Sequence, residues 1–131
     1  MKPVVVEEKV RQRLTEIYHT PLQKVKLEIK DGLLAEFDFA SKDQRIIGQI
    51  KTSRPSRVGK QKGKVRIAQV GDLSRDCLLL AAKKNAKTRL LVLTNGKVFD
   101  TFRISKWGKA AEALGIRIRL EQVRCGSVHE S

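Results

Sequence analysis

The chain has 131 residues, of which 40% are hydrophobic, enough for one domain with a single core. Its 28 Lys and Arg residues against 14 Asp and Glu residues give a formal net charge of +14, which favours a polyanionic partner, nucleic acid first. No apolar run approaches the roughly 20 residues that span a bilayer, and the only apolar run near the start, residues 4–6, is followed by two glutamates. We therefore expect a cytoplasmic protein without a membrane partner, with one domain over 1–124 and a tail over 125–131.

The first predicted element is a helix that begins at Pro3. Proline is suited to this position because its missing N–H would have no hydrogen-bond partner in the first turn of a helix. Apolar residues then recur at helical spacing and form one stripe that faces the core. The stripe consists of Val6, Val10, Leu14, Ile17 and Tyr18. At about 100° per residue, Glu7 falls at the edge of this stripe and Glu8 on the far side. For Glu7 a functional acid and a solvated first-turn acid remain equal alternatives, whereas Glu8 is expected in solvent.

Three strands in a meander are expected next. Residues 25–29 alternate between apolar and charged side chains, an Asp-Gly pair at 31–32 favours a hairpin turn, and residues 33–40 form the second strand. A turn at 41–44 leads to the apolar run 46–50, the third strand. The second and third strands carry the polar residues from which function can be argued.

Those polar residues can converge. Side chains alternate along a strand, so Gln49 and Lys51 share a face, and pairing of the two strands brings Asp38 beside them. Asp38 could bind a hard cation such as Mg²⁺, and the backbone carbonyl of Ile50 is a further candidate ligand. Lys51 could orient or deprotonate a water, or stabilise a phosphate. This is the minimal set for metal-assisted phosphodiester hydrolysis. Glu36 lies on the same face as Asp38 and could be a further acid of the site, but it is expected to pair with a cross-strand lysine.

An aspartate followed by (E/Q)-x-K on the adjacent strand resembles the PD-(D/E)XK nuclease superfamily, with Asp38, Gln49 and Lys51 at the matching positions. This superfamily includes restriction endonucleases, archaeal Holliday-junction resolvases and Mrr-like enzymes. Phe37 stands where the name-giving proline would be, and Gln49 replaces the acid, a QxK variant that resembles the Mrr-like branch.

The resemblance implies an α/β fold with a restriction endonuclease-like core, in the order helix, three-stranded meander, helix, strand, helix, strand. The mixed central sheet combines the antiparallel meander with parallel strands and is flanked by helices. The resemblance also implies Mg²⁺, or alternatively Mn²⁺, bound by Asp38, Gln49, Ile50 and Glu7. It further implies duplex or branched DNA as substrate and a homodimer.

The segment after the third strand, residues 52–66, is basic and contains no acid. Its cations are Arg54, Arg57, Lys60, Lys62, Lys64 and Arg66. Two glycines and a proline argue against regular structure here. Because it directly follows the motif, we expect it to contact nucleic-acid phosphates rather than to be a solvated linker.

Helical spacing predicts a second helix, which begins as early as residue 64 and ends near 85. Its core stripe consists of Val70, Leu73, Cys77, Leu80 and Ala81. Gln69 lies on this helix and could reach the site, but an exposed glutamine is expected. Cys77 is expected to be a buried thiol and Cys125 a free one, since no Cys/His grouping indicates a disulfide or zinc.

A central strand over 89–94, buried on both faces, is expected next. Residues 97–104 are predicted as a hairpin partner or an irregular excursion. Ser105 is a candidate N-cap for a helix that places Trp107 in the core and ends at Gly115. The last strand, 116–120, should run parallel to the central strand.

Three functions are compatible with the sequence. A metal-dependent endonuclease acting on DNA combines the motif, the order of elements and the charge. The neutral Gln49 motivates the alternative of a nuclease-like nucleic-acid-binding protein without catalysis. The third alternative is a basic RNA-binding protein, against which the aromatic content of 5% counts modestly, because single-stranded bases stack on aromatic side chains.

Overall fold

A computed structural model describes residues 2–56, 59 and 62–123, which form an α/β fold of four helices and five strands. The helices are α1 (Pro3–Tyr18), α2 (Ile67–Ala82), α3 (Gly96–Ile104) and α4 (Lys106–Ala113). The strands are β1 (Gln23–Lys30), β2 (Leu33–Ala40), β3 (Ile46–Lys51), β4 (Thr88–Leu93) and β5 (Ile116–Leu120). Within these described residues, none of the helices combines the length and the apolar character needed to cross a membrane.

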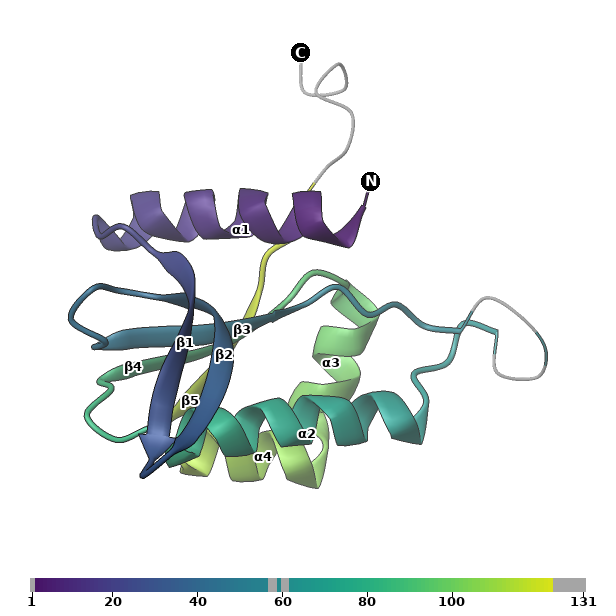
Figure 1. Ribbon diagram of the computed structural model, residues 1–131. Helices are drawn as coiled ribbons and strands as arrows, with labels where there is room; N and C mark the ends of the chain where they lie inside the picture. Colours follow the sequence, from purple (N-terminus) through teal and green to yellow (C-terminus); the bar gives the residue numbers. More distant parts are fainter. Residues whose placement is uncertain (1, 57–58, 60–61, 124–131) are drawn as a thin grey trace, which may run out of the picture.

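The strands form one open sheet in the order β1-β2-β3-β4-β5. The first three are an antiparallel meander, and β4 and β5 continue the sheet parallel to β3. Figure 1 shows α1 on one face of the sheet and α2, α3 and α4 on the other. The predicted mixed sheet flanked by helices is therefore confirmed, with α3 as a helix beyond the expected order.

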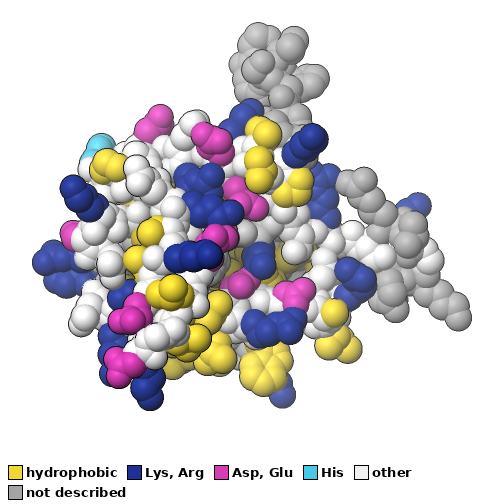
Figure 2. Space-filling model, viewed as in Figure 1, with side chains coloured by type: hydrophobic (Ala, Val, Ile, Leu, Met, Phe, Trp, Pro, Cys, Tyr) yellow, Lys and Arg dark blue, Asp and Glu magenta, His cyan; other side chains and the backbone are white. Residues whose placement is uncertain are grey.

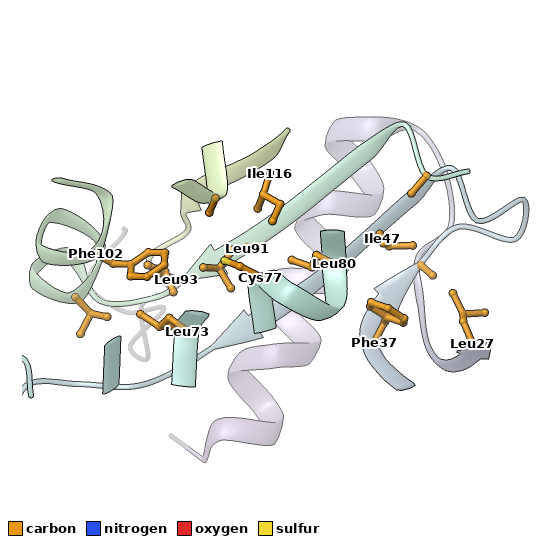
Figure 3. Packing of buried hydrophobic residues seen from close by; sticks show 14 residues of the cluster. Leu27, Phe37, Ile47, Leu73, Cys77, Leu80, Leu91, Leu93, Phe102 and Ile116 are labelled. Carbon is orange, nitrogen blue, oxygen red and sulfur yellow. The ribbon is translucent and has the colours of Figure 1, made fainter. Parts of the chain in front are cut away.

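The core lies on both faces of β4, as expected for a central strand. Leu90 and Val92 pack against the buried residues of α1, whereas Leu91 and Leu93 face the layer of α2, α3 and α4. Figure 3 shows the larger cluster, in which side chains from α2 and α3 meet those of the sheet. Cys77 belongs to this cluster, and burial, followed by the nearby negative charge of Asp76, raises the pKa of its thiol to about 12.

Residues 97–104 form α3, which contradicts both structures expected for them. The Asn-Gly pair at 95–96 favours a turn, but Asn95 caps the helix: its Oδ1 accepts hydrogen bonds from the N–H groups of Lys97 at 3.0 Å and Val98 at 3.1 Å. Val98 and Phe102, four residues apart, are buried beneath the helix. The cap and this short apolar stripe are sufficient to define the element.

Trp107, predicted to lie in the core, is 51% exposed. The residues of α4 that are buried are Gly108 and Ala111, because α4 packs so closely on α3 that a Cβ at Gly108 would lie 2.0 Å from the carbonyl oxygen of Phe102. Ile17, predicted for the core stripe of α1, is also 41% exposed. The boundaries of α2 are narrower than expected, since it begins at residue 67 and ends at 82.

Strand β2 contains one extra residue opposite the start of β1. Gln23 pairs with Ala40, whereas Val25 pairs with Phe37, so a step of two residues on β1 matches a step of three on β2. Such a bulge turns the following side chain to the other face. Phe37 accordingly packs with the α2 layer and Phe39 with α1, although simple alternation places them on one face.

Gly48 of β3 lies directly against Phe39. A Cβ at position 48 would be 2.0 Å from Cζ of the fully buried Phe39 ring. Replacement of Gly48 by Ala should therefore lower the free energy of unfolding by about 1–3 kcal/mol, because the ring has no room to move.

Gly71→Ala is a matched control, since nothing lies within 4 Å of a Cβ at this exposed position of α2. The control should be neutral or stabilise the protein by up to about 1 kcal/mol. Urea denaturation measures both variants. Equal stability of Gly48→Ala and the wild type would contradict the close packing of Gly48 on Phe39.

Candidate active site

The hydrogen-bond ladder between β2 and β3 ends at Phe39 and Gly48. Bonded pairs in an antiparallel ladder recur every second residue, so the backbone of Ile50 would next pair with that of Phe37. Instead, the N–H of Ile50 donates to Oδ2 of Asp38 at 2.7 Å. Beyond the bulge the strands separate, and a side chain replaces the backbone partner.

Gln49 makes a second side-chain link across the same opening. Its Oε1 accepts from the N–H of Asp38 at 3.2 Å, and its Nε2 donates to the carbonyl of Glu36 at 3.0 Å. The residue is only 5% exposed. Both ends of the amide are therefore engaged with the backbone of β2.

The carbonyl of Ile50 faces the same opening. In a strand, the N–H and C=O of one residue leave on the same side, and Ile50 directs its N–H toward β2. The neighbouring carbonyl of Lys51 points the other way, where it accepts from the N–H of Thr94 at 3.2 Å. Asp38 Oδ2, Gln49 and the Ile50 carbonyl thus surround the point where β2 leaves β3.

Lys51 shares a strand face with Gln49 and reaches α2. Its Nζ lies 2.9 Å from Oδ2 of Asp76, and the side chains of Lys51 and Asp76 are 33% and 16% exposed. The Oδ2 atom is shielded from solvent, so the Lys51 ammonium is the group that compensates its charge. Burial raises the pKa of Asp76, the hydrogen bond and charge of Lys51 oppose the rise, and the Asp38 carboxylate adds to it.

Glu7 approaches from the opposite face of the sheet. It is half-buried on α1 while Glu8 is exposed, which confirms the predicted difference between the two glutamates. Burial raises the pKa of Glu7, and the negative charge of Asp38 adds to the rise, while Lys24, Arg11 and Lys51 lower it. The negative charge of Asp38 therefore acts on Glu7 of α1 and on Asp76 of α2.

Basic side chains surround these acids. Arg11 of α1 donates from Nη1 to the carbonyl of Asp38 at 3.2 Å, and Lys24 of β1 lies 3.4 Å from Glu36. The second contact confirms the predicted cross-strand partner of Glu36. Figure 2 shows acidic side chains interleaved with Lys and Arg over the region between α1 and α2.

The oxygen atoms at the opening suit a metal ion that keeps most of its bound waters. Across residues 2–56, 59 and 62–123, no three His, Cys, Asp or Glu side chains are grouped so as to hold an ion. The structure does combine a carboxylate, Asp38, with a main-chain carbonyl, that of Ile50, at one opening. Mg²⁺ keeps several waters and is commonly held by one or two carboxylates, so these donors fit it, whereas an all-protein cage is not formed.

The basic segment follows directly after Lys51. Arg54, Lys62, Lys64 and Arg66 are exposed, as phosphate contacts require. Arg57 and Lys60, the other two cations predicted to bind nucleic acid, lie outside the described residues.

Two polar residues on the buried face of α2 were not predicted there from the sequence. Asp76 follows Leu73 by three positions and precedes Leu80 by four, so it lies on the buried face of α2, and this spacing was the available signal. Gln69 was expected to be exposed, but it is 6% exposed and hydrogen-bonded at both ends of its amide. Its position four residues before Leu73 marks the same buried face.

Comparison with known proteins found no matching family model, no matching curated protein and no matching solved structure. The interpretation of the site therefore depends on its own geometry.

The raised pKa of Asp76 predicts how stability changes with pH. A carboxyl whose pKa is higher in the folded than in the unfolded state stabilises the fold below its ordinary value of 3.8, and this contribution is lost as pH rises through the folded pKa. The free energy of unfolding of wild type minus that of Asp76→Asn should therefore fall as pH rises from 3.8 through the folded pKa.

Asp43→Asn provides the opposite control. The pKa of Asp43 is lowered, first by the hydrogen bond from the Ser41 hydroxyl and then by further hydrogen bonds and charges. The free energy of unfolding of wild type minus that of Asp43→Asn should therefore not fall as pH rises. Urea titrations at several pH values measure both differences. A wild-type minus Asp76→Asn difference that is independent of pH would rule out the raised pKa.

The two-ended role of Gln49 predicts that Gln49→Glu destabilises the protein. An ionised carboxylate still accepts from the N–H of Asp38 but cannot donate to the carbonyl of Glu36. The loss should be about 1–3 kcal/mol near neutral pH, and smaller in acid, where the new carboxyl is protonated and can donate. Gln23→Glu, at an exposed position of β1, is the control. Denaturation at pH values of about 5 and 8 should separate the two variants, and equal losses would contradict this role.

Proposed function

We propose that this protein is a metal-dependent endonuclease that hydrolyses DNA phosphodiester bonds. The observation that carries the proposal is the meeting of Asp38 and Gln49 at the opening between β2 and β3, with Lys51 next on the same face as Gln49. The proposed fold family is the restriction endonuclease-like core of the PD-(D/E)XK superfamily, in a QxK form similar to Mrr-like enzymes or Holliday-junction resolvases.

The order of elements supports this assignment. A helix, a three-stranded meander, a helix and a strand occur in the expected sequence, followed by α3 and α4 in place of one helix and then by β5. The motif residues lie on the second and third strands of the meander, where the resemblance requires them.

The metal-binding part of the proposal uses Asp38 and the carbonyl of Ile50. A bound Mg²⁺ or Mn²⁺ supplies charge neutralisation at the phosphate and lowers the pKa of a water. Gln49 and Glu7 remain candidate ligands. For Gln49, only the second lone pair of Oε1 is available, because the first accepts from Asp38 and Nε2 is bound to Glu36.

Lys51 is proposed to act directly on the reacting groups, by orienting the attacking water or by stabilising charge on the phosphate oxygens. Asp76 pairs with this side chain from the α2 side, at 2.9 Å. The exposed cations of residues 54–66 and the net charge of +14 favour binding of the DNA backbone. Cleavage of both strands of a duplex needs two sites, which a homodimer would provide.

A binding protein without catalysis is the second candidate, because one specific observation favours it. Gln49 contributes no charge, and its amide is engaged in holding β2. Under this alternative the basic surface binds nucleic acid while no phosphodiester bond is broken.

One cleavage experiment separates the candidates. Linear, nicked, branched and single-stranded DNA would be incubated with Mg²⁺, Mn²⁺ or chelator and with wild type, Asp38→Asn or Lys51→Ala. Asp38→Asn keeps an oxygen acceptor for the N–H of Ile50 while it removes the charge. It should abolish metal-dependent cutting, and Lys51→Ala should slow it by roughly 10²–10⁴-fold.

Lys26→Ala, at an exposed position of β1, should cut at the wild-type rate. Binding of the panel without cutting by any of the proteins would select the second candidate. Cutting by Asp38→Asn at the wild-type rate, or no binding to any nucleic acid, would overturn the assignment.

A further inference from the structure

Gln69, in the first turn of α2, joins the two ends of the basic segment. Its Oε1 accepts from the N–H of Arg66 at 2.8 Å, and its Nε2 donates to the carbonyl of Arg54 at 2.5 Å. The residue is 6% exposed. A single buried amide therefore holds residues that are twelve positions apart in the chain.

A second set of contacts lies farther along the same segment. The N–H of Ser56 donates to the carbonyl of Lys64 at 3.0 Å, and the N–H of Gly63 donates to the carbonyl of Ser56 at 2.6 Å. With the Gln69 contacts, these bonds join the outgoing and returning parts of the segment at two levels. The level formed by Gln69 is the one adjacent to β3 and to Lys51.

The residues held in this way present positive charge. Arg54, Lys64 and Arg66 are exposed, and the segment contains no acid. Lys97 of α3 adds to them, because a Cβ at Gly63 would lie 3.8 Å from the Lys97 Nζ. The surface therefore combines cations from the segment with one from a separate helix.

We propose that Gln69 is a positioning residue: it holds Arg54 and Arg66 in place so that these two arginines bind the phosphate backbone of the substrate. The inference rests on the proposed function and adds to it a specific determinant of affinity. Capping of α2 alone would need only the contact with Arg66, since an N3 side chain caps a helix by accepting from the N-cap N–H. The contact with Arg54 is additional, and it fixes the second arginine relative to the first.

This arrangement affects DNA binding because it lowers the conformational entropy that the basic segment loses when it binds. Long cationic side chains on an untethered segment lose backbone and side-chain freedom when they bind, which reduces affinity. With both arginine backbones held by one buried amide, part of this freedom is already absent in the free protein. Gln69 should thus influence the affinity for DNA and the number of phosphates that the protein neutralises. It should not influence the rate at which bound DNA is cleaved.

The test compares Gln69→Glu and Gln69→Leu with wild type. Glutamate keeps the acceptor for Arg66 and loses the donor to Arg54, whereas leucine loses both. For a DNA duplex, Gln69→Glu should raise Kd about tenfold and reduce the slope of log K against log salt by roughly 0.9 for each phosphate that is no longer neutralised. The cleavage rate at saturating DNA should be unchanged, and backbone hydrogen exchange at residues 63 and 66 should be faster in Gln69→Leu.

A double-mutant cycle identifies the residue through which Gln69 acts. Arg54→Ala should weaken binding less in the Gln69→Glu background than in wild type, because the arginine is no longer held in position. Gln12→Leu, at an exposed position of α1, is the control and should change neither Kd nor the salt slope.

Additive effects of the two substitutions, or an unchanged salt slope in both Gln69 variants, would overturn the role of Gln69 while leaving the nuclease proposal intact. Failure of the wild type to bind DNA would overturn both.

Discussion

The replacement of backbone hydrogen bonds by the side chains of Asp38 and Gln49 determines the geometry of the site. Next to the extra residue that β2 has relative to β1, the ladder between β2 and β3 ends at Phe39 and Gly48, which would leave partly buried main-chain groups unpaired. Asp38 satisfies the N–H of Ile50, and Gln49 satisfies the N–H of Asp38 and the carbonyl of Glu36. These side-chain hydrogen bonds remove the free-energy cost of unpaired main-chain groups. They also bridge the separated strands, so the opening is a stable part of the fold.

Burial explains why charge gathers on both sides of this opening. Lys51 emerges on the α2 face, where the sheet is largely covered, and a partly buried ammonium needs a counter-ion. Gln49 is neutral, so no acid on β3 itself can serve, and Asp76 supplies the charge from α2. On the other face of the sheet, Glu7 and Arg11 of α1 lie over the bulge in β2. With Lys24 of β1, five separate elements, α1, β1, β2, β3 and α2, thus contribute charged groups to one region.

Much of this arrangement was predictable because it depends on local patterns. The alternation of β1, the Asp-Gly turn, the continuous apolar run of β4 and the Ser105 cap each specify an element within a few residues. The bulge was not predictable, since residues 36–39 alternate regularly and only the register with β1 shows the extra residue. Trp107 was misplaced because close packing of α3 on α4 excludes a large ring and selects Gly108. Asp76 was overlooked although its spacing from Leu73 and Leu80 marked a buried face.

The structural role of Gln49 also explains why an amide can stand at position 49, where the motif that this sequence resembles has an acid. An ionised carboxylate could satisfy the N–H of Asp38 but would face the carbonyl of Glu36 without a proton to donate. The amide matches both groups, at 3.2 Å and 3.0 Å. Position 49 is thus constrained by the backbone of β2 as well as by any reaction at the opening. The residues free of that constraint are Asp38, through Oδ1, and Lys51, and on them the chemistry proposed for this chain depends.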